Sequence, residues 1–211
     1  MPFTLEDQGI GNVVTCETEK ISEAKIIIKG NNNSIFFGKG SSIGFGDINI
    51  NGNDNVLDFG ENNRFGRLKT IVQDGSSLKF GKFCSVEQAY FLSRDGRSII
   101  FGNDCMISFQ VDVRTSDAHG IWKVGTAELI NAPGDILIED NVWIGQGAVI
   151  SKNTVIHSNS VVGMKSFLQN QVVPKNSVVA GTPAKLIYGG IEWTRHIDIN
   201  KREEELKKNF T

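Results

Sequence analysis

The sequence has little proline and little cysteine. Its 211 residues include 4 prolines and 3 cysteines against 23 glycines, so its turns must be built mainly from glycine and asparagine. Cys16, Cys84 and Cys105 are odd in number and far apart, which argues against a disulfide framework and favours a reducing cytoplasm. No close cysteine and histidine spacing is present, so we expect no metal site.

The charge balance and the distribution of hydrophobic residues exclude further classes of protein. The chain has 22 Lys and Arg against 24 Asp and Glu, so it lacks the basic excess of a nucleic-acid-binding protein. No apolar run approaches the roughly 18 residues of a membrane span. The first residues, MPFTLEDQGIGN, have neither a basic region nor a long apolar region, so we expect no secretory signal.

From Ile138 onward, aliphatic residues recur at every sixth position. They are Ile138, Ile144, Ile150, Ile156, Val162 and Leu168. Small or β-branched residues stand two positions before these, from Val142 to Ser166. A period of six does not suit a helix but suits a short strand followed by a tight corner. The pattern predicts an all-β fold, a parallel β-helix in which each coil packs on its neighbours.

A looser repeat extends the pattern toward the N-terminus. Phe-Gly pairs begin at Phe37, Phe59, Phe80 and Phe101, at spacings of 22, 21 and 21 residues. Aligning the last two pairs with Ile138 places Cys84, Cys105 and Val142 in one column. We therefore interpret the two cysteines as small core residues in a stack.

The repeat is interrupted once, by an excess of about 16 residues between Phe101 and Ile138. This segment, about 114–133, predicts a loop extruded from the coil, and long loops in compact repeats are usually functional. It contains the stretch TSDAHGIW, which carries His119.

The two ends of the chain differ from the repeats. Residues 1–30 predict an N-terminal cap with some strand, included in a β-helix domain of residues 1–190. Residues 191–211 predict a short C-terminal helix or tail, because KREEELKKNF has helix formers and opposite charges at helical spacing.

Two stretches after the loop carry a family signature. The run VWIGQGAVISKNTVIHSNSVVGMKSF is followed by VVPKNSVVAGTPAKLI. With the D-x-H loop before them, they resemble the hexapeptide-repeat acyltransferases, closely over residues 99–188 and loosely over 30–190. The loop is most similar to that of sugar and capsule polysaccharide O-acetyltransferases, including the polysialic acid O-acetyltransferases.

The resemblance implies a fold, a reaction and an assembly. It implies a left-handed coil, whereas the general rule for parallel strands predicts right-handed crossovers. It implies an O-acetyltransferase that uses acetyl-CoA, with a sugar or glycan acceptor that could be a sialic acid polymer; the cysteines and their spacing add the expectations of a cytoplasmic location and of no metal. It also implies a homotrimer whose active sites lie between subunits.

The resemblance also assigns catalytic residues. It implies that His119 is the general base, and a neutral imidazole can take the proton of an attacking hydroxyl near neutral pH. Asp117 could orient this histidine, bind the sugar or hold the loop turn. The hexad frame turns Trp143 outward, and the resemblance places it near His119 and the acetyl group. His157 and His196 are weaker alternatives to His119.

For the cofactor, the resemblance implies a path along the later coils. A backbone N–H near Gln146 would donate to the oxyanion, and lysines, Lys185 first, would contact the phosphates. The implied acetyl-CoA-binding residues are Gly145, Gln146, Gly163, Met164, Lys165, Gly181, Thr182, Pro183 and Lys185.

One departure leaves the acceptor open. Some relatives that acetylate simple sugars carry an asparagine in the coil before the histidine loop, whereas SVEQAYFLSRDG has none. Glu87, Gln88, Tyr90 or Arg94 could bind the acceptor instead.

Three functions other than O-acetylation are also compatible with the sequence. An amino-sugar N-acetyltransferase or an antibiotic acetyltransferase would keep the donor and change the acceptor. A zinc β-helix of the carbonic anhydrase type would need three converging histidines, and the chain has 3 in total. A non-catalytic β-helix scaffold would not bind acetyl-CoA.

Overall fold

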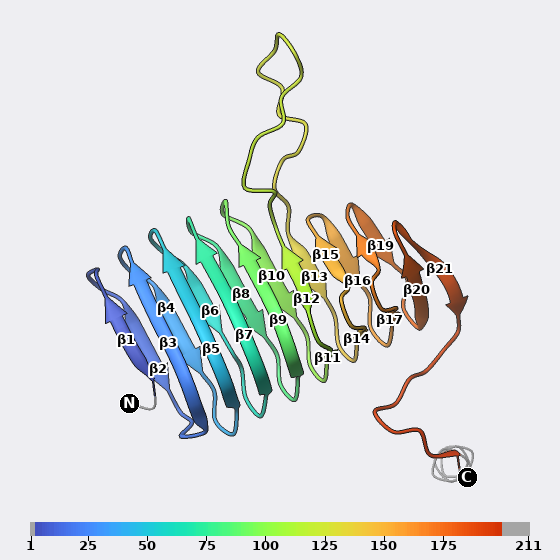
Figure 1. The fold of residues 1–211 in the computed structure, drawn as a ribbon, viewed down its shortest axis with the longest axis horizontal. Helices are drawn as coiled ribbons and strands as arrows, with labels where there is room; N and C mark the ends of the chain where they lie inside the picture. The colour runs from blue at the N-terminus through green and yellow to red at the C-terminus, as the bar shows by residue number, and fades with distance from the viewer. Residues whose placement is uncertain (1–2, 200–211) are drawn as a thin grey trace.

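A left-handed parallel β-helix forms the body of the protein, as the computed structural model shows, and one long loop stands out from it (Figure 1). The structure describes residues 3–199, and in that range the regular structure is almost entirely strand. The predicted all-β fold is therefore confirmed. The predicted C-terminal helix falls largely on residues 200–211, which lie outside the described residues.

Two sheets run along the axis of the β-helix. Consecutive strands of the longer sheet pair in parallel, apart from the antiparallel final pair. Its strands are β1 (Thr4–Asp7), β3 (Ile21–Lys29), β5 (Ser42–Asn51), β7 (Arg64–Gln73), β9 (Ser85–Ser93), β11 (Met106–Ile107), β12 (Val111–Arg114), β14 (Trp143–Ile144), β15 (Val149–Ser151), β17 (Val161–Val162), β18 (Phe167–Leu168), β20 (Ser177–Gly181) and β21 (Ala184–Gly189).

The other sheet is parallel throughout. Its strands are β2 (Val13–Cys16), β4 (Ser34–Phe37), β6 (Val56–Asp58), β8 (Ser77–Phe80), β10 (Ser98–Phe101), β13 (Ile136–Ile138), β16 (Thr154–Ile156) and β19 (Gln171–Val173). The long strands β3, β5, β7 and β9 cover a path that later coils divide into two short strands, since β9 pairs with both β11 and β12.

Asparagine builds many of the corners, as the scarcity of proline predicts. Asparagines at corners such as Asn32, Asn62 and Asn153 have φ between 55° and 57°, a left-handed conformation that asparagine tolerates better than most residues. Inside another corner, Asn55 Nδ2 donates to Asn33 Oδ1 at 2.9 Å, and the N–H of Ser76 donates to Asn55 Oδ1. Such ladders satisfy backbone groups that the coils bury.

The core contains the predicted columns. The aliphatic hexad residues from Ile138 to Leu168 are fully buried. Phe80 and Phe101 stack with ring centroids 4.6 Å apart, and Phe59 stacks on the other side of Phe80. Cys84 and Cys105 lie on adjacent coils and are buried, which agrees with their interpretation as core residues.

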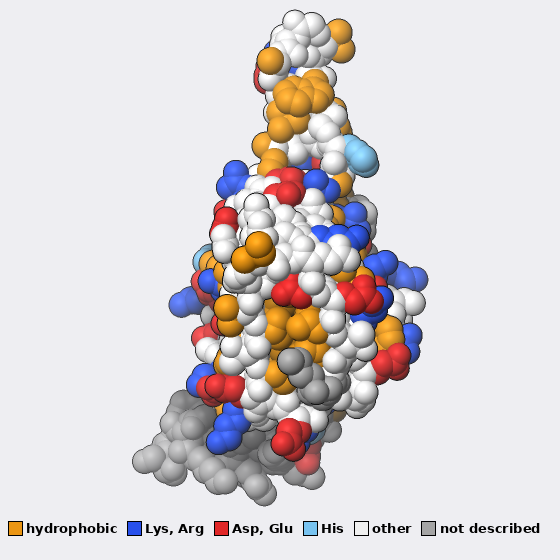
Figure 2. All heavy atoms as spheres, turned by 90° about the vertical axis from the view of Figure 1, so that its left-hand side faces the viewer, with side chains coloured by type: hydrophobic (Ala, Val, Ile, Leu, Met, Phe, Trp, Pro, Cys, Tyr) orange, Lys and Arg blue, Asp and Glu red, His pale blue; other side chains and the backbone are white. Residues whose placement is uncertain are grey.

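The N-terminal segment belongs to the same coils. Strands β1, β2 and β3 pair with their successors in the two sheets, so the β-helix begins at Thr4. Figure 2 views the molecule from this end and shows hydrophobic side chains at the centre of the terminal coil. Phe3, Leu5, Val14 and Cys16 pack there, only partly buried. No helix in residues 3–199 is long and apolar enough to cross a membrane.

Candidate functional site

The predicted loop leaves the coil between β12 and β13. Strand β12 ends at Arg114, and β13 begins at Ile136. The base of the loop is closed by a hydrogen bond of 3.0 Å from the N–H of Gly134 to the carbonyl of Thr115. Farther out, Trp122 and Leu129 form an antiparallel bridge. The loop therefore projects as a narrow hairpin-like arm (Figure 1).

His119 lies on this loop beside a hollow of about 260 Å³. The histidine is exposed. The hollow is lined by Asp95, Ser116, Ala118, His119, Gly120, Trp122, Leu129, Asn131 and Pro133. An imidazole in such a place is accessible to a substrate from solvent, as a general base must be.

A buried lysine ties the histidine loop to the coils. Lys152 follows β15, and its side chain is only 3% exposed. Its Nζ donates to Asp117 Oδ2 at 2.5 Å and to the carbonyl of Asn131 at 2.8 Å. The Asn131 amide donates to the same carboxylate and to the carbonyl of His119, each at 2.8 Å. The backbone of His119 is therefore held through three polar side chains.

This network changes the interpretation of Asp117. Its hydrogen bond from Lys152 is the main cause that lowers the pKa of the carboxyl, and the bond from Asn131 lowers that pKa further. Among the described residues, no hydrogen bond joins Asp117 to the imidazole of His119. Of the three roles considered for Asp117, the geometry supports holding the loop.

Sequence reasoning missed Lys152 and Asn131. In the sequence, Lys152 stands at a corner between two hexads, where a lysine is ordinarily solvated. Only the folded loop covers it, because its partners lie 35 and 21 positions away.

Trp143 faces outward from β14, as the hexad frame predicts, and is 37% exposed. Its ring lies 6.0 Å from that of Trp193, whose Nε1 donates to the carbonyl of Asn141 at 2.8 Å. Trp143 does not line the hollow beside His119. A single chain therefore does not bring these two predicted site residues to one pocket.

The predicted cofactor residues gather on successive coils. The N–H of Lys165 donates to the carbonyl of Gln146 at 2.8 Å, and Thr182 Oγ1 donates to the carbonyl of Lys165 at 3.2 Å. Met164 is 63% exposed beside them. Lys185 lies just beyond, on β21, paired with Ala180 of β20; Gly181 ends β20, and Thr182 and Pro183 form the turn.

Two of the three glycines of the cofactor set, Gly145 and Gly163, also have a packing role. A Cβ on Gly145 would lie 2.8 Å from the nitrogen of Met164 and 2.9 Å from the carbonyl oxygen of Val162. A Cβ on Gly163 would lie 2.8 Å from that of Ala180. The spacing of the coils alone therefore favours glycine at both positions.

The remaining histidines lie apart from the loop. His157 is half-buried, and its Nδ1 lies 2.9 Å from Glu139 Oε1. This hydrogen bond is the first cause of the lowered pKa of Glu139. Within residues 3–199, no three histidine, cysteine or acidic side chains are placed to hold a metal ion.

The segment after β21 packs against the coils. Arg195 Nη2 donates to Asp104 Oδ1 at 2.8 Å, and its Nη1 donates to Ser85 Oγ at 2.8 Å. An arginine near a chain end is ordinarily solvated, and Arg195 departs from that expectation. Its partners lie about 90 and 110 positions upstream, so no local pattern reveals them.

Comparisons with known proteins give the relatives of this chain. The family model described as bacterial transferase hexapeptide (six repeats) matches residues 135–170. The chain is 29% identical over 190 residues to the polysialic acid O-acetyltransferase of Neisseria meningitidis, covering 90% of this chain and 88% of that protein. This chain therefore carries the hexapeptide repeat of bacterial transferases, and its relatives are O-acetyltransferases.

Solved structures extend the similarity to the full length of the chain. The crystal structure of the polySia-specific acetyltransferase NeuO gives a TM-score of 0.83 at 27% identity, covering 100% of this chain and 99% of that one. The polysialic acid O-acetyltransferase OatWY gives a TM-score of 0.85 at 25% identity, covering 98% and 99%. The similarity therefore includes the N-terminal coils, beyond the matched hexads.

Proposed function

We propose that this chain transfers an acetyl group from acetyl-CoA to a hydroxyl of a sialic acid polymer. The observation that carries the proposal is the combination of an exposed His119 on an anchored loop with full-length similarity to two acetyltransferases of polysialic acid. Hydroxyl groups are the nucleophiles available for an O-acetyl transfer, and they need a base at neutral pH.

In the proposed mechanism, His119 accepts the proton of the attacking hydroxyl through a ring nitrogen. The hydroxyl oxygen forms the ester bond, and the bond to sulfur breaks. The same histidine then returns the proton to the departing thiolate, so the base is regenerated. Lys152 and Asn131 take no part in the proton transfer, but they fix the backbone from which the imidazole projects.

The residues of the later coils fit a CoA thioester, which supplies the activated acetyl group. Met164 offers an exposed apolar surface next to Gly163, as the pantetheine arm requires. Lys165, just before β18, and Lys185, on β21, are both exposed, so their ammonium groups can contact phosphates. The backbone N–H near Gln146 would stabilise the developing oxyanion.

The proposed site is completed by a second copy of the chain. Trp143 and the cofactor residues lie on the coils, away from the His119 hollow of the same chain. A homotrimer would let the loop of one subunit meet the coils of its neighbour. The projection of the loop far beyond the body supports this arrangement (Figure 1).

The test is His119→Ala with polysialic acid and acetyl-CoA, followed by release of free thiol and by mass spectrometry of the polymer. Loss of a general base predicts a fall in kcat of about 10²–10⁴-fold. His157→Gln is the matched control, because it removes a histidine from the coil and should keep the rate. Near-normal turnover by the His119→Ala variant would refute the mechanism. Acetylation of amino sugars instead of the polymer would favour the N-acetyltransferase alternative.

A further inference from the structure

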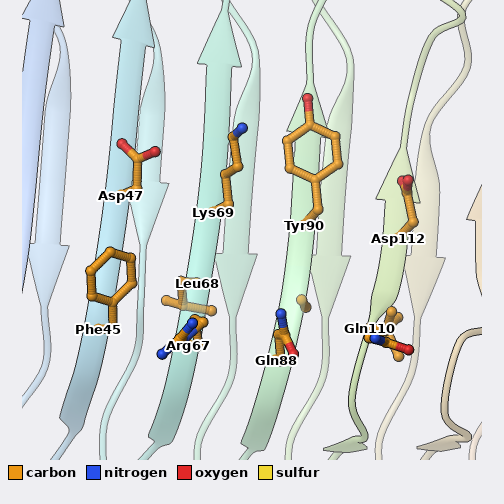
Figure 3. A pocket seen from close by; sticks show the side chains of 11 residues that line it. Phe45, Asp47, Arg67, Leu68, Lys69, Gln88, Tyr90, Gln110 and Asp112 are labelled. Atoms are coloured by element: carbon orange, nitrogen blue, oxygen red, sulfur yellow. The ribbon is translucent and has the colours of Figure 1, made fainter.

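A second hollow lies on the N-terminal half of the long sheet, and the catalytic assignment does not use it. It has a volume of about 420 Å³ and crosses β5, β7, β9 and the start of β12. Its lining includes two rows of side chains from β5, β7, β9 and the stretch from Gln110 into β12 (Figure 3). One row is Phe45, Arg67, Gln88 and Gln110, and the other is Asp47, Lys69, Tyr90 and Asp112.

The fold creates this groove through strand pairing. Gly46, Leu68, Ala89 and Val111 lie in register on neighbouring strands, and each separates one residue of the first row from one of the second. Neighbouring strands are about 4.8 Å apart, so the groove extends about 14 Å along the axis. It is long enough for more than one sugar unit.

The chemistry of the lining is that of a carbohydrate site. Phe45 and Tyr90 offer aromatic rings, on which the apolar face of a sugar can pack. Arg67 lies over the ring of Phe45 at 5.3 Å, and Lys69 lies 5.9 Å from the ring of Tyr90. Gln88 contributes an amide that can both donate and accept hydrogen bonds.

The charges of the groove favour an acidic sugar. Asp112 is already paired with Arg114, and Asp47 accepts a hydrogen bond of 2.9 Å from Asn49. Arg67 and Lys69 have no carboxylate within ion-pair distance among the described residues. An arginine can bind a carboxylate through two parallel hydrogen bonds, which a neutral sugar cannot offer.

The groove leads toward the loop. Asp112 lines its end, Arg114 lies two residues farther along the same strand and 5.8 Å from the ring of Tyr90, and the loop begins at Thr115. A chain of sugars in the groove could therefore pass the base of the arm that carries His119.

We propose that this groove is a distal binding site for a carboxylated polysaccharide, in which Arg67 and Lys69 bind sugar carboxylates and Phe45 and Tyr90 support the rings. The inference rests on the proposed function for its acceptor. These side chains raise the affinity of the protein for long acceptors, whereas the acetyl transfer takes place at His119.

The experiment measures binding directly, so it does not depend on turnover. Sialic acid oligosaccharides of increasing length are titrated into the full chain, with maltooligosaccharides as the neutral probe. The Arg67→Gln/Lys69→Gln double variant should bind the long acidic oligosaccharide at least about 10-fold more weakly than the unmodified chain, because two charge-assisted contacts are lost. Lys79→Gln is the control, since it removes an exposed positive charge from β8 of the other sheet.

Kinetics provide the second readout. The double variant should raise KM for the polymer about 10-fold and leave kcat and the KM for a single sialic acid unchanged. Equal binding by the double variant and the Lys79→Gln control, or equal binding of neutral and acidic oligosaccharides, would overturn the proposal. A change in oligomeric state of the double variant would also overturn it, by making the groove a subunit interface. If the unmodified chain binds polysialic acid but does not acetylate it, the proposed function is refuted, whereas the proposed binding site in the groove stands.

Discussion

The network beneath the histidine loop predicts an asymmetric response to removal of its two charges. Asp117→Ala leaves the Lys152 ammonium buried, with the carbonyl of Asn131 as its remaining partner. An uncompensated buried charge costs about 3–5 kcal/mol, and the retained hydrogen bond favours the lower end, about 3 kcal/mol. Lys152→Met is milder, since Asp117 is 38% exposed and keeps its bond from Asn131. Its expected cost is about 1 kcal/mol.

The double variant distinguishes this reasoning from a direct catalytic role of Asp117. With both charges absent, no buried ammonium remains, so Lys152→Met/Asp117→Ala should recover about 2 kcal/mol relative to Asp117→Ala alone. If the Asp117→Ala variant relieves the cost of its buried ammonium by lifting the loop, its kcat/KM falls with that cost. The double variant should then recover kcat/KM about 30-fold, since about 1.4 kcal/mol corresponds to a factor of ten.

The assays are urea denaturation, limited proteolysis of the loop and kcat/KM for the polymer. Proteolysis is included because the strained loop can open without global unfolding. Lys123→Met is the control, since Lys123 pairs with Glu128 on the exposed arm, where an ion pair contributes about 0–1 kcal/mol. If the double variant is as inactive as Asp117→Ala, the carboxylate acts on the chemistry itself and the positioning argument is wrong.

The same network predicts an acid dependence with a definite sign. The Lys152 hydrogen bond lowers the pKa of Asp117 in the folded protein. The stability that this carboxylate contributes is therefore complete above its unfolded pKa, about 3.9, and is lost as the pH falls below that value. Lys152→Met should reduce this loss, which unfolding curves at several acidic pH values would measure.

Three further predictions concern the coils and the segment after β21. Gly145→Ala should destabilise the protein by about 1–3 kcal/mol because its Cβ would meet backbone atoms of the next coil, whereas Gly189→Ala, with nothing within 4 Å, should be nearly neutral in the same denaturation assay. Phe80→Ala should cost about 3–5 kcal/mol by opening a cavity in the aromatic stack, and a cost below 1 kcal/mol by calorimetry would contradict that packing. Arg195→Gln should release the segment from Asp104, seen as faster proteolysis near residue 195 with kcat for a single sialic acid retained.

The sequence by itself determined the coil. A six-residue period repeats a local geometry, and each coil packs only on its neighbours, so the inward residues from Ile138 to Leu168 could be read directly. The same arithmetic located the extruded loop and its histidine, because an insertion is visible wherever a period is broken. The family resemblance added the left hand of the coil, which the period does not contain.

Tertiary structure alone decided which side chains from distant coils meet. Lys152 reads as an ordinary surface lysine until the loop folds back over it, and Arg195 reads as a solvated charge until the segment reaches Asp104. The sequence offers Gln88 and Tyr90 as acceptor candidates, but the groove that contains them needs the register of β7 and β9, which places Arg67 beside Gln88 and Lys69 beside Tyr90. A repeat determines the face on which a residue lies, because that face follows from local strand geometry. The contacts of the residue depend on how insertions and chain ends fold back onto the coils.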